Sequence, residues 1–195
     1  MPDDIQAVIE AATTERDRLL LRTLWATGAR VSEVLALRPK DVRRDSLVLI
    51  NCKNPGRPVK RIYLPAGESD LPAELLLWAR EHNLADDAPL FFSRKRRPDG
   101  GLKPLSRGQV WEIVKEASHK ADVKVLALRR SKDGARGEAA PVHPHLFRHS
   151  RIRQIVRHTK SLPLAQRQAG WSRLQMAYLS VSDEEARAMM AEVPS

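Results

Sequence analysis

Residues 26–35 read Ala-Thr-Gly-Ala-Arg-Val-Ser-Glu-Val-Leu, and this stretch joins two helical patterns. Before it, an apolar stripe at helical spacing runs from residue 20 to residue 27, where Gly28 interrupts it. After the glycine, a shorter apolar pattern should end before Pro39, because the residue preceding a proline disfavours the α region. The stretch therefore predicts a helix, a glycine turn and a second, short helix that begins near Arg30.

Outside this stretch the sequence is helical at both ends and β-like in the middle. Runs rich in apolar residues at 47–50, 59–64 and 90–92 predict strands, and Asn-Pro-Gly at 54–56 supplies a turn between the first two. Glycine-rich residues 131–140 break the helical pattern of the second half. Further helices are predicted at 5–12, 106–117, 145–156, 164–169, 174–179 and 186–190. The expected fold is mainly α with a small antiparallel β-sheet, in one domain over residues 1–195.

The helix predicted from residue 106 has a clear start and a clear apolar face. Ser106 is a favourable N-cap, because its hydroxyl can accept a hydrogen bond from a backbone N–H of the first turn. We expect Val110, Trp111, Val114 and Ala117 to lie together on the buried face of this helix.

The charge balance indicates a polyanionic partner. Lys and Arg number 34 against 24 Asp and Glu, so the formal net charge is +10, a balance typical of nucleic-acid binders. The cations are unevenly distributed and gather in two clusters. We predict that these clusters contact the polyanion through Arg94, Lys95, Arg96, Arg97, Arg129, Arg130 and Lys132.

Several other protein classes are disfavoured. No apolar run approaches the roughly 20 residues that span a bilayer, and the N-terminus is acidic, so neither a membrane span nor a secretory signal is expected. The only cysteine, Cys52, has no thiol partner for a disulfide or a zinc site. We interpret it as a buried strand residue and expect a cytoplasmic protein without a metal or other cofactor.

Three segments, taken in order, carry a family resemblance. Residues 26–35, with an arginine after Thr-Gly and then a Ser-Glu pair, resemble the first signature of tyrosine recombinases and phage integrases. Residues 145–150, His-Leu-Phe-Arg-His-Ser, look like the second signature, His-x-x-Arg. Gly170-Trp171 followed by Ala177-Tyr178 is similar to the third. The three motifs cover nearly the whole chain in the family's order.

The resemblance implies metal-free cleavage and rejoining of DNA through a covalent 3′-phosphotyrosyl intermediate. Tyr178 is then the nucleophile, and of the two tyrosines in the chain the other, Tyr63, falls in a predicted strand. Glu33 would support the site from behind. The implied catalytic residues are Arg30, Lys53, His145, Arg148, Trp171 and Tyr178.

The physical chemistry of phosphate transfer explains the choice of residue types. Charge grows on the non-bridging oxygens, and two guanidinium groups, Arg30 and Arg148, can clamp them in a fixed orientation. Backbone N–H groups at the start of the helix after Gly28 would add to this anion site. His145 can donate to the phosphate or pass a proton, because its ordinary pKa is close to neutral.

The 5′ oxygen must be protonated as it leaves, and the resemblance places a lysine on the β-hairpin for that step. Lys53 matches best, and Lys60 on the returning strand is the alternative. Trp171 stands where histidine is commoner in the family, and its indole can donate a hydrogen bond but cannot move a proton. Three nearby histidines could be interpreted as a metal cluster, but their spacing fits no common zinc pattern.

The resemblance also implies partners and leaves alternatives open. Double-stranded DNA is the expected substrate, and the helix at about 183–191 is expected to dock on a neighbouring protomer, giving a tetramer on DNA and a monomer without it. The usual N-terminal DNA-clamping domain is absent from this sequence, which should weaken DNA affinity and site choice. The alternatives are an enzyme resembling type IB topoisomerases and a catalytically silent DNA-binding module of the same fold.

Overall fold

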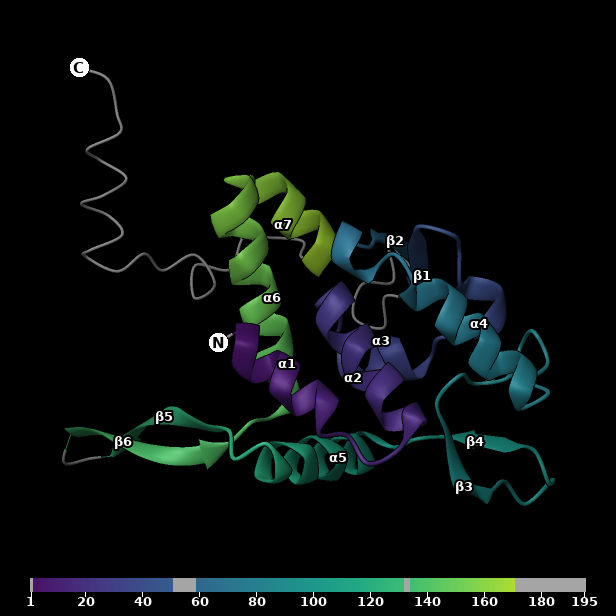
Figure 1. Ribbon diagram of the computed structural model, residues 1–195, viewed down its shortest axis with the longest axis horizontal. Helices are drawn as coiled ribbons and strands as arrows, with labels where there is room; N and C mark the ends of the chain where they lie inside the picture. Colours follow the sequence, from purple (N-terminus) through teal and green to yellow (C-terminus); the bar gives the residue numbers. More distant parts are fainter. Residues whose placement is uncertain (1, 51–58, 132–133, 171–195) are drawn as a thin grey trace.

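The computed structural model describes residues 2–50, 59–131 and 134–170 (Figure 1). Helix α2 (Glu15–Thr27) lies at the centre, where most of its residues are buried: Leu19, Leu20, Leu21 and Leu24 are all fully buried. Helix α1 (Pro2–Glu10) packs against it, and the short helix α3 (Val31–Leu35) follows the Gly28 turn.

The middle of the chain forms two small hairpins and one amphipathic helix. Strands β1 (Ser46–Ile50) and β2 (Val59–Tyr63) pair antiparallel, with Leu47 opposite Ile62 and Leu49 opposite Lys60. Helix α4 (Leu71–Glu81) covers α2 on one side. Strands β3 (Phe92–Arg96) and β4 (Leu102–Pro104) form the second antiparallel pair, and short 3₁₀ turns lie at Pro39–Asp41 and Ala66–Glu68.

The second half returns to helices. Helix α5 (Arg107–Lys120) runs beneath the others in Figure 1 and contacts α1, α3 and α6. Strands β5 (Lys124–Ser131) and β6 (Gly134–Pro141) form a third hairpin that extends away from the helices. Helix α6 (Pro144–Thr159) packs along α2, and α7 (Leu162–Ala169) folds back on α6. One large apolar cluster joins α1 to α5 and the start of α6, with Phe91 and Phe147 among its fully buried members, and a small second cluster of Ile152, Ala165 and Ala169 joins α6 to α7.

The predicted fold class is confirmed, with differences of detail. The strand predicted at 90–92 begins only at Phe92, and α4 was not predicted. The helical pattern is broken at 131–140 as predicted, but the break takes the form of the β5–β6 hairpin, which was not predicted. Trp111 lies on the exposed face of α5, 46% exposed, while Val110, Val114 and Ala117 are buried as predicted.

Other expectations concern parts that the structure does not describe. The helices predicted at 174–179 and 186–190, and the burial of Cys52, lie outside the described residues. Within the described residues, no helix is both long enough and apolar enough to cross a membrane.

Candidate active site

The site begins at the end of α2, where threonine hydroxyls and a glycine end the helix. Thr27 donates to the Thr23 carbonyl over 2.6 Å, and its hydroxyl accepts from the Ala29 backbone N–H over 3.2 Å. Gly28 adopts the left-handed conformation, with φ 59°, and its N–H donates to the Leu24 carbonyl. The chain therefore leaves the buried helix in one fixed direction, and Arg30 follows two residues later.

Arg30 is held by Glu33, one turn into α3. The backbone N–H of Arg30 donates to Oε2 of Glu33 over 2.9 Å, and its Nη1 donates to Oε1 over 2.9 Å. The Glu33 side chain is 0% exposed and that of Arg30 is 20% exposed. The pair is thus largely buried, and the Arg30 backbone N–H is occupied by Glu33.

Lys60, on strand β2, is the second cation on Glu33. Its Nζ donates to Oε2 over 2.8 Å, and its side chain is only 9% exposed. Burial lowers the pKa of Lys60, Glu33 opposes that shift, and the positive charges of Arg148 and Arg30 add to it. Burial alone would raise the pKa of Glu33, but Lys60 and Arg30 hold it below its ordinary value.

Arg148 is the largest fully buried side chain among the described residues, at 2% exposure. Its Nη1 donates to the Gly28 carbonyl over 2.7 Å and its Nη2 to the Ala169 carbonyl over 2.9 Å. These two residues lie at the C-terminal ends of α2 and α7, where the helix dipoles favour a cation. Arg148 therefore joins the first sequence motif to the segment that leads into the third.

Histidines gather at the N-terminal end of α6. His143 caps the helix and stacks on Trp111, with ring centroids 5.9 Å apart. His145 is exposed, and its ring meets that of His149 edge to face at 4.6 Å. Burial, followed by the positive charges of His145 and Arg153, lowers the pKa of His149 to about 4. His149 is therefore neutral at pH 7.

Together these side chains make a cationic cluster. Lys60 lies in the electrostatic field of both Arg30 and Arg148, and His149 in that of His145 and Arg148. Arg30, Lys60 and Arg148 with the single carboxylate of Glu33 carry a net charge of +2. A cluster of this sign suits a phosphodiester, whose negative charge grows during transfer.

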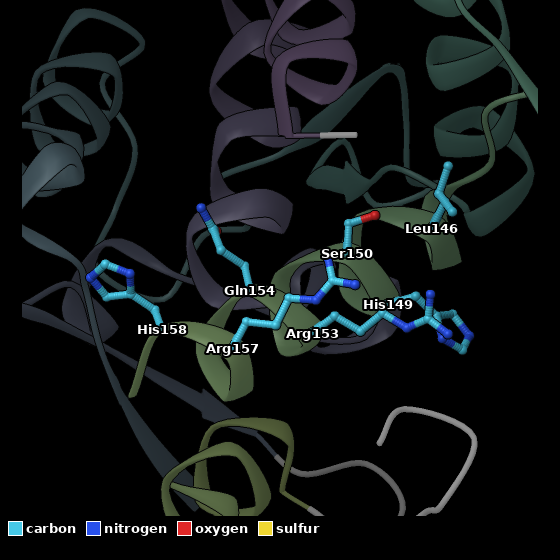
Figure 2. A pocket seen from close by; sticks show the side chains of 7 residues that line it. All are labelled: Leu146, His149, Ser150, Arg153, Gln154, Arg157 and His158. Atoms are coloured by element: carbon cyan, nitrogen blue, oxygen red, sulfur yellow. The ribbon is translucent and has the colours of Figure 1, made fainter. Parts of the chain in front are cut away.

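A groove lies beside the cluster, on the outer face of α6 (Figure 2). Its volume is about 310 Å³. Four of its lining residues carry basic or imidazole side chains that follow one another along the helix, at His149, Arg153, Arg157 and His158. Arg153 and Arg157 thus extend the positive charge along α6, away from His145.

Known proteins resemble this chain both in sequence and in structure. The sequence profile described as "Phage integrase family" matches residues 1–185. The chain belongs to this family. Tyrosine recombinase XerA of Pyrococcus furiosus is 29% identical over 150 residues, which are 76% of this chain and 44% of the relative.

Solved structures of recombinases share the fold. The crystal structure of XerA recombinase superposes with a TM-score of 0.72 at 17% identity, over 98% of this chain and 63% of that one. The crystal structure of XerH site-specific recombinase bound to difH substrate superposes with a TM-score of 0.65 at 21% identity, over 96% of this chain and 52% of that one. The chain thus spans about half the length of the Pyrococcus furiosus relative and of the XerH chain.

Some of the predicted site residues lie within the described part of the chain, and others lie outside it. It brings Arg30, Glu33 and Arg148 to one cluster and His145 to the adjacent helix start. Lys53, Trp171, Tyr178 and Lys132 lie outside the described residues. Among the described residues, no group of histidine, cysteine and acidic side chains is placed to hold a metal.

The two basic clusters predicted to contact DNA fall on hairpins. Arg94, Lys95, Arg96 and Arg97 are all exposed, on β3 and in the turn after it. Arg129 and Arg130 belong to β5, where the ladder pairs Arg129 with Arg136 of β6. The first cluster is therefore ordered and open to solvent, which a DNA contact requires.

Sequence reasoning missed two features of this phage integrase site. Lys60 was predicted only as an alternative proton donor. Its position could have indicated burial, because Lys60 and the buried Ile62 are two residues apart on a strand and share a face. Arg151 has no such signal. Its guanidinium lies 5.5 Å from the centre of the Trp25 ring, and its Nε is buried without a hydrogen-bond partner.

Proposed function

We propose that this chain is the catalytic part of a site-specific DNA recombinase that cuts and rejoins DNA through a 3′-phosphotyrosyl intermediate. The observation that supports it best is the cluster of Arg30, Glu33, Lys60 and Arg148, which unites the first two recombinase-like motifs at one buried, cationic point. Family membership over residues 1–185 supports the same assignment.

The proposed reaction is a transesterification at phosphorus. The Tyr178 oxygen attacks, a phosphorus–tyrosine bond forms, the bond to the 5′ oxygen breaks, and that oxygen takes up a proton. The phenol gives its own proton to water, and the positive charge of the cluster favours the resulting phenolate. Lys53 supplies the proton to the leaving oxygen, Arg30 and Arg148 neutralise the non-bridging oxygens, and His145 and Trp171 donate to the phosphate.

DNA is the proposed partner, contacted by the two hairpin clusters and by α6. The net charge of +10 and the exposure of Arg94 to Arg97 support this, as does the XerH structure, which was solved bound to its difH substrate. We further propose assembly into a tetramer on DNA through the segment at about 183–191, no assembly without DNA, and a cytoplasmic location.

A nicked suicide DNA substrate tests the reaction. Because the nick releases the leaving strand, a covalent protein–DNA adduct accumulates that withstands SDS and is destroyed by protease. We expect this adduct from the wild type and none from Tyr178→Phe. If the wild type gives no adduct, or if Tyr178→Phe gives as much as the wild type, the proposed function is wrong.

The same experiment separates the remaining alternatives. A silent DNA-binding module would retain DNA in a strongly salt-dependent way without any adduct. An enzyme of the type IB topoisomerase kind would relax supercoiled plasmid lacking a recombination site and would act as a monomer. Exchange of strands between two duplexes supports the recombinase.

A further inference from the structure

We propose that Lys60 is a positioning residue that fixes the phosphate-binding arginine Arg30 through the buried carboxylate of Glu33. This inference rests on the proposed function and assigns to Lys60 a role different from proton donation. It makes strand β2 part of the active site, since Lys60 lies on β2 whereas Arg30 and Glu33 flank the start of α3.

The first support is the way in which Glu33 is used. Its Oε1 accepts from Arg30 Nη1, and its Oε2 accepts from both the Arg30 backbone N–H and Lys60 Nζ, all within 2.9 Å. One carboxylate therefore sets the backbone and the side chain of Arg30 together. An arginine held both at its backbone N–H and at one guanidinium nitrogen presents its other N–H groups in one orientation, which phosphate recognition needs.

The second support is the burial of that carboxylate. Glu33 is 0% exposed, so its negative charge must be compensated by neighbouring groups rather than by water. The charged groups that face it are Arg30 at the start of α3 and Lys60 on β2, with Arg148 of α6 beyond Lys60. Without Lys60 the carboxylate would keep one cationic partner in place of two, and its protonated form would become more favourable.

Protonation of Glu33 would loosen Arg30. A neutral carboxyl group accepts hydrogen bonds from a guanidinium more weakly than a carboxylate does. Arg30, with a side chain 20% exposed, could then turn toward solvent. The consequence for catalysis is misorientation of the phosphate, because displacement by about 1 Å can slow a reaction by roughly 100-fold.

The third support concerns what Lys60 itself contacts. Its Nζ donates to Glu33 over 2.8 Å, and its side chain is 9% exposed. A proton donor must lie within hydrogen-bonding reach of the leaving oxygen. Lys60 is instead committed to the carboxylate behind Arg30, which leaves proton donation to Lys53.

The test compares Lys60→Met with Lys60→Arg on the suicide substrate. Lys60→Met should cut the rate of adduct formation at saturating DNA by roughly 10- to 100-fold. DNA affinity should change by less than about threefold, because contacts to DNA phosphates elsewhere dominate affinity. Lys60→Arg keeps a cation on Glu33 and should recover most of the rate. Lys40→Met is the matched control, since it removes an exposed lysine–carboxylate pair with Asp87, and it should leave the rate unchanged.

A substrate with sulfur in place of the leaving 5′ oxygen separates positioning from proton donation. A thiolate leaves without being protonated, because thiols are far more acidic than alcohols. The sulfur substrate should restore the rate of Lys53→Ala and should not restore that of Lys60→Met. Restoration of Lys60→Met would make Lys60 the proton donor and overturn the proposal.

A measurement on the protein without DNA tests the role of Lys60 separately from the cleavage reaction. The Arg30 backbone amide donates to Glu33, so its NMR chemical shift should follow the charge of that carboxylate. In Lys60→Met, or in Lys60→Leu should the first variant not fold, the midpoint of this titration should move to higher pH. An unmoved midpoint would overturn the inference. A moved midpoint in a protein that forms no adduct would support it and refute only the proposed function.

Discussion

Replacing Gly28 with alanine is expected to destabilise the protein by about 2–5 kcal/mol, from two causes. The first is the backbone, because φ is 59° and an L-residue in the left-handed region costs roughly 1–2 kcal/mol. The second is packing. The new Cβ would lie 3.3 Å from Cγ of Arg151 and 3.7 Å from Cγ1 of Ile152. Forcing a methyl group into a packed contact costs about 1–3 kcal/mol.

Two other glycines separate these causes. Gly100 has a φ of 81°, but a Cβ there would meet nothing within 4 Å, so Gly100→Ala should show the backbone cost alone. Gly67 lacks both features, and Gly67→Ala should change stability by less than about 1 kcal/mol. Urea unfolding of the wild type and the three variants measures these differences, provided that the slope with denaturant is unchanged.

The order of the three variants decides the outcome. We expect Gly28→Ala to lose the most stability, Gly100→Ala less and Gly67→Ala the least. Equal losses for Gly28→Ala and Gly100→Ala would show that close packing of the turn on α6 contributes nothing. In that case the packing part of the reasoning would be refuted, while the backbone part would stand.

Three further predictions concern caps and titrating groups. Ser106→Ala should lower the free energy of unfolding by about 1 kcal/mol in urea, because the Ser106 hydroxyl accepts from the Gln109 N–H at the start of α5; an unchanged midpoint would contradict this. Thr27→Val should cost about 1–3 kcal/mol, since its hydroxyl makes two buried hydrogen bonds that valine cannot make, and Thr159→Val, at an exposed hydroxyl, should cost less. The pKa of His149 is lowered to about 4, so folding disfavours its protonated form, and stability should fall as the pH drops from about 6.5 to about 4. His149→Asn should remove on the order of 1–2 kcal/mol of that decline, a figure discounted for solvent screening; an equally steep decline in the variant would exclude His149 as its source.

Local signals in the sequence were sufficient for much of the fold. The Gly28 turn and the Ser106 cap depend on residues within one helical turn, and the structure has both. The burial of Glu33 was not predicted, because its two cationic partners come from different parts of the chain, and Lys60 is 27 residues away. A short-range sequence pattern shows that Glu33 can pair with Arg30, but it does not show that β2 helps to bury the pair.

Other features depend on tertiary context in the same way. Strand β6 is rich in alanine and glycine, which have low β-propensity, so only its pairing with β5 identifies it as a strand. Arg148 was expected to face the phosphate, and its bonds to the Gly28 and Ala169 carbonyls could not be foreseen, because backbone acceptors have no side-chain signature. Trp111 was placed on the wrong face of α5 for a simpler reason: it directly follows the buried Val110 and therefore lies about 100° around the helix from it.

The bond from Arg148 to the Gly28 carbonyl spans 120 residues of sequence. A contact between residues so far apart in the sequence forms late, because a long loop must close before the bond contributes any stability. During synthesis on the ribosome, α2 and the Gly28 turn emerge long before α6, and a nascent chain lacking α6 has neither His145 nor Arg148. The cluster of Arg30, Glu33, Lys60 and Arg148 therefore assembles only after most of the chain has been made, so that partly synthesised copies lack groups that we propose to be catalytic.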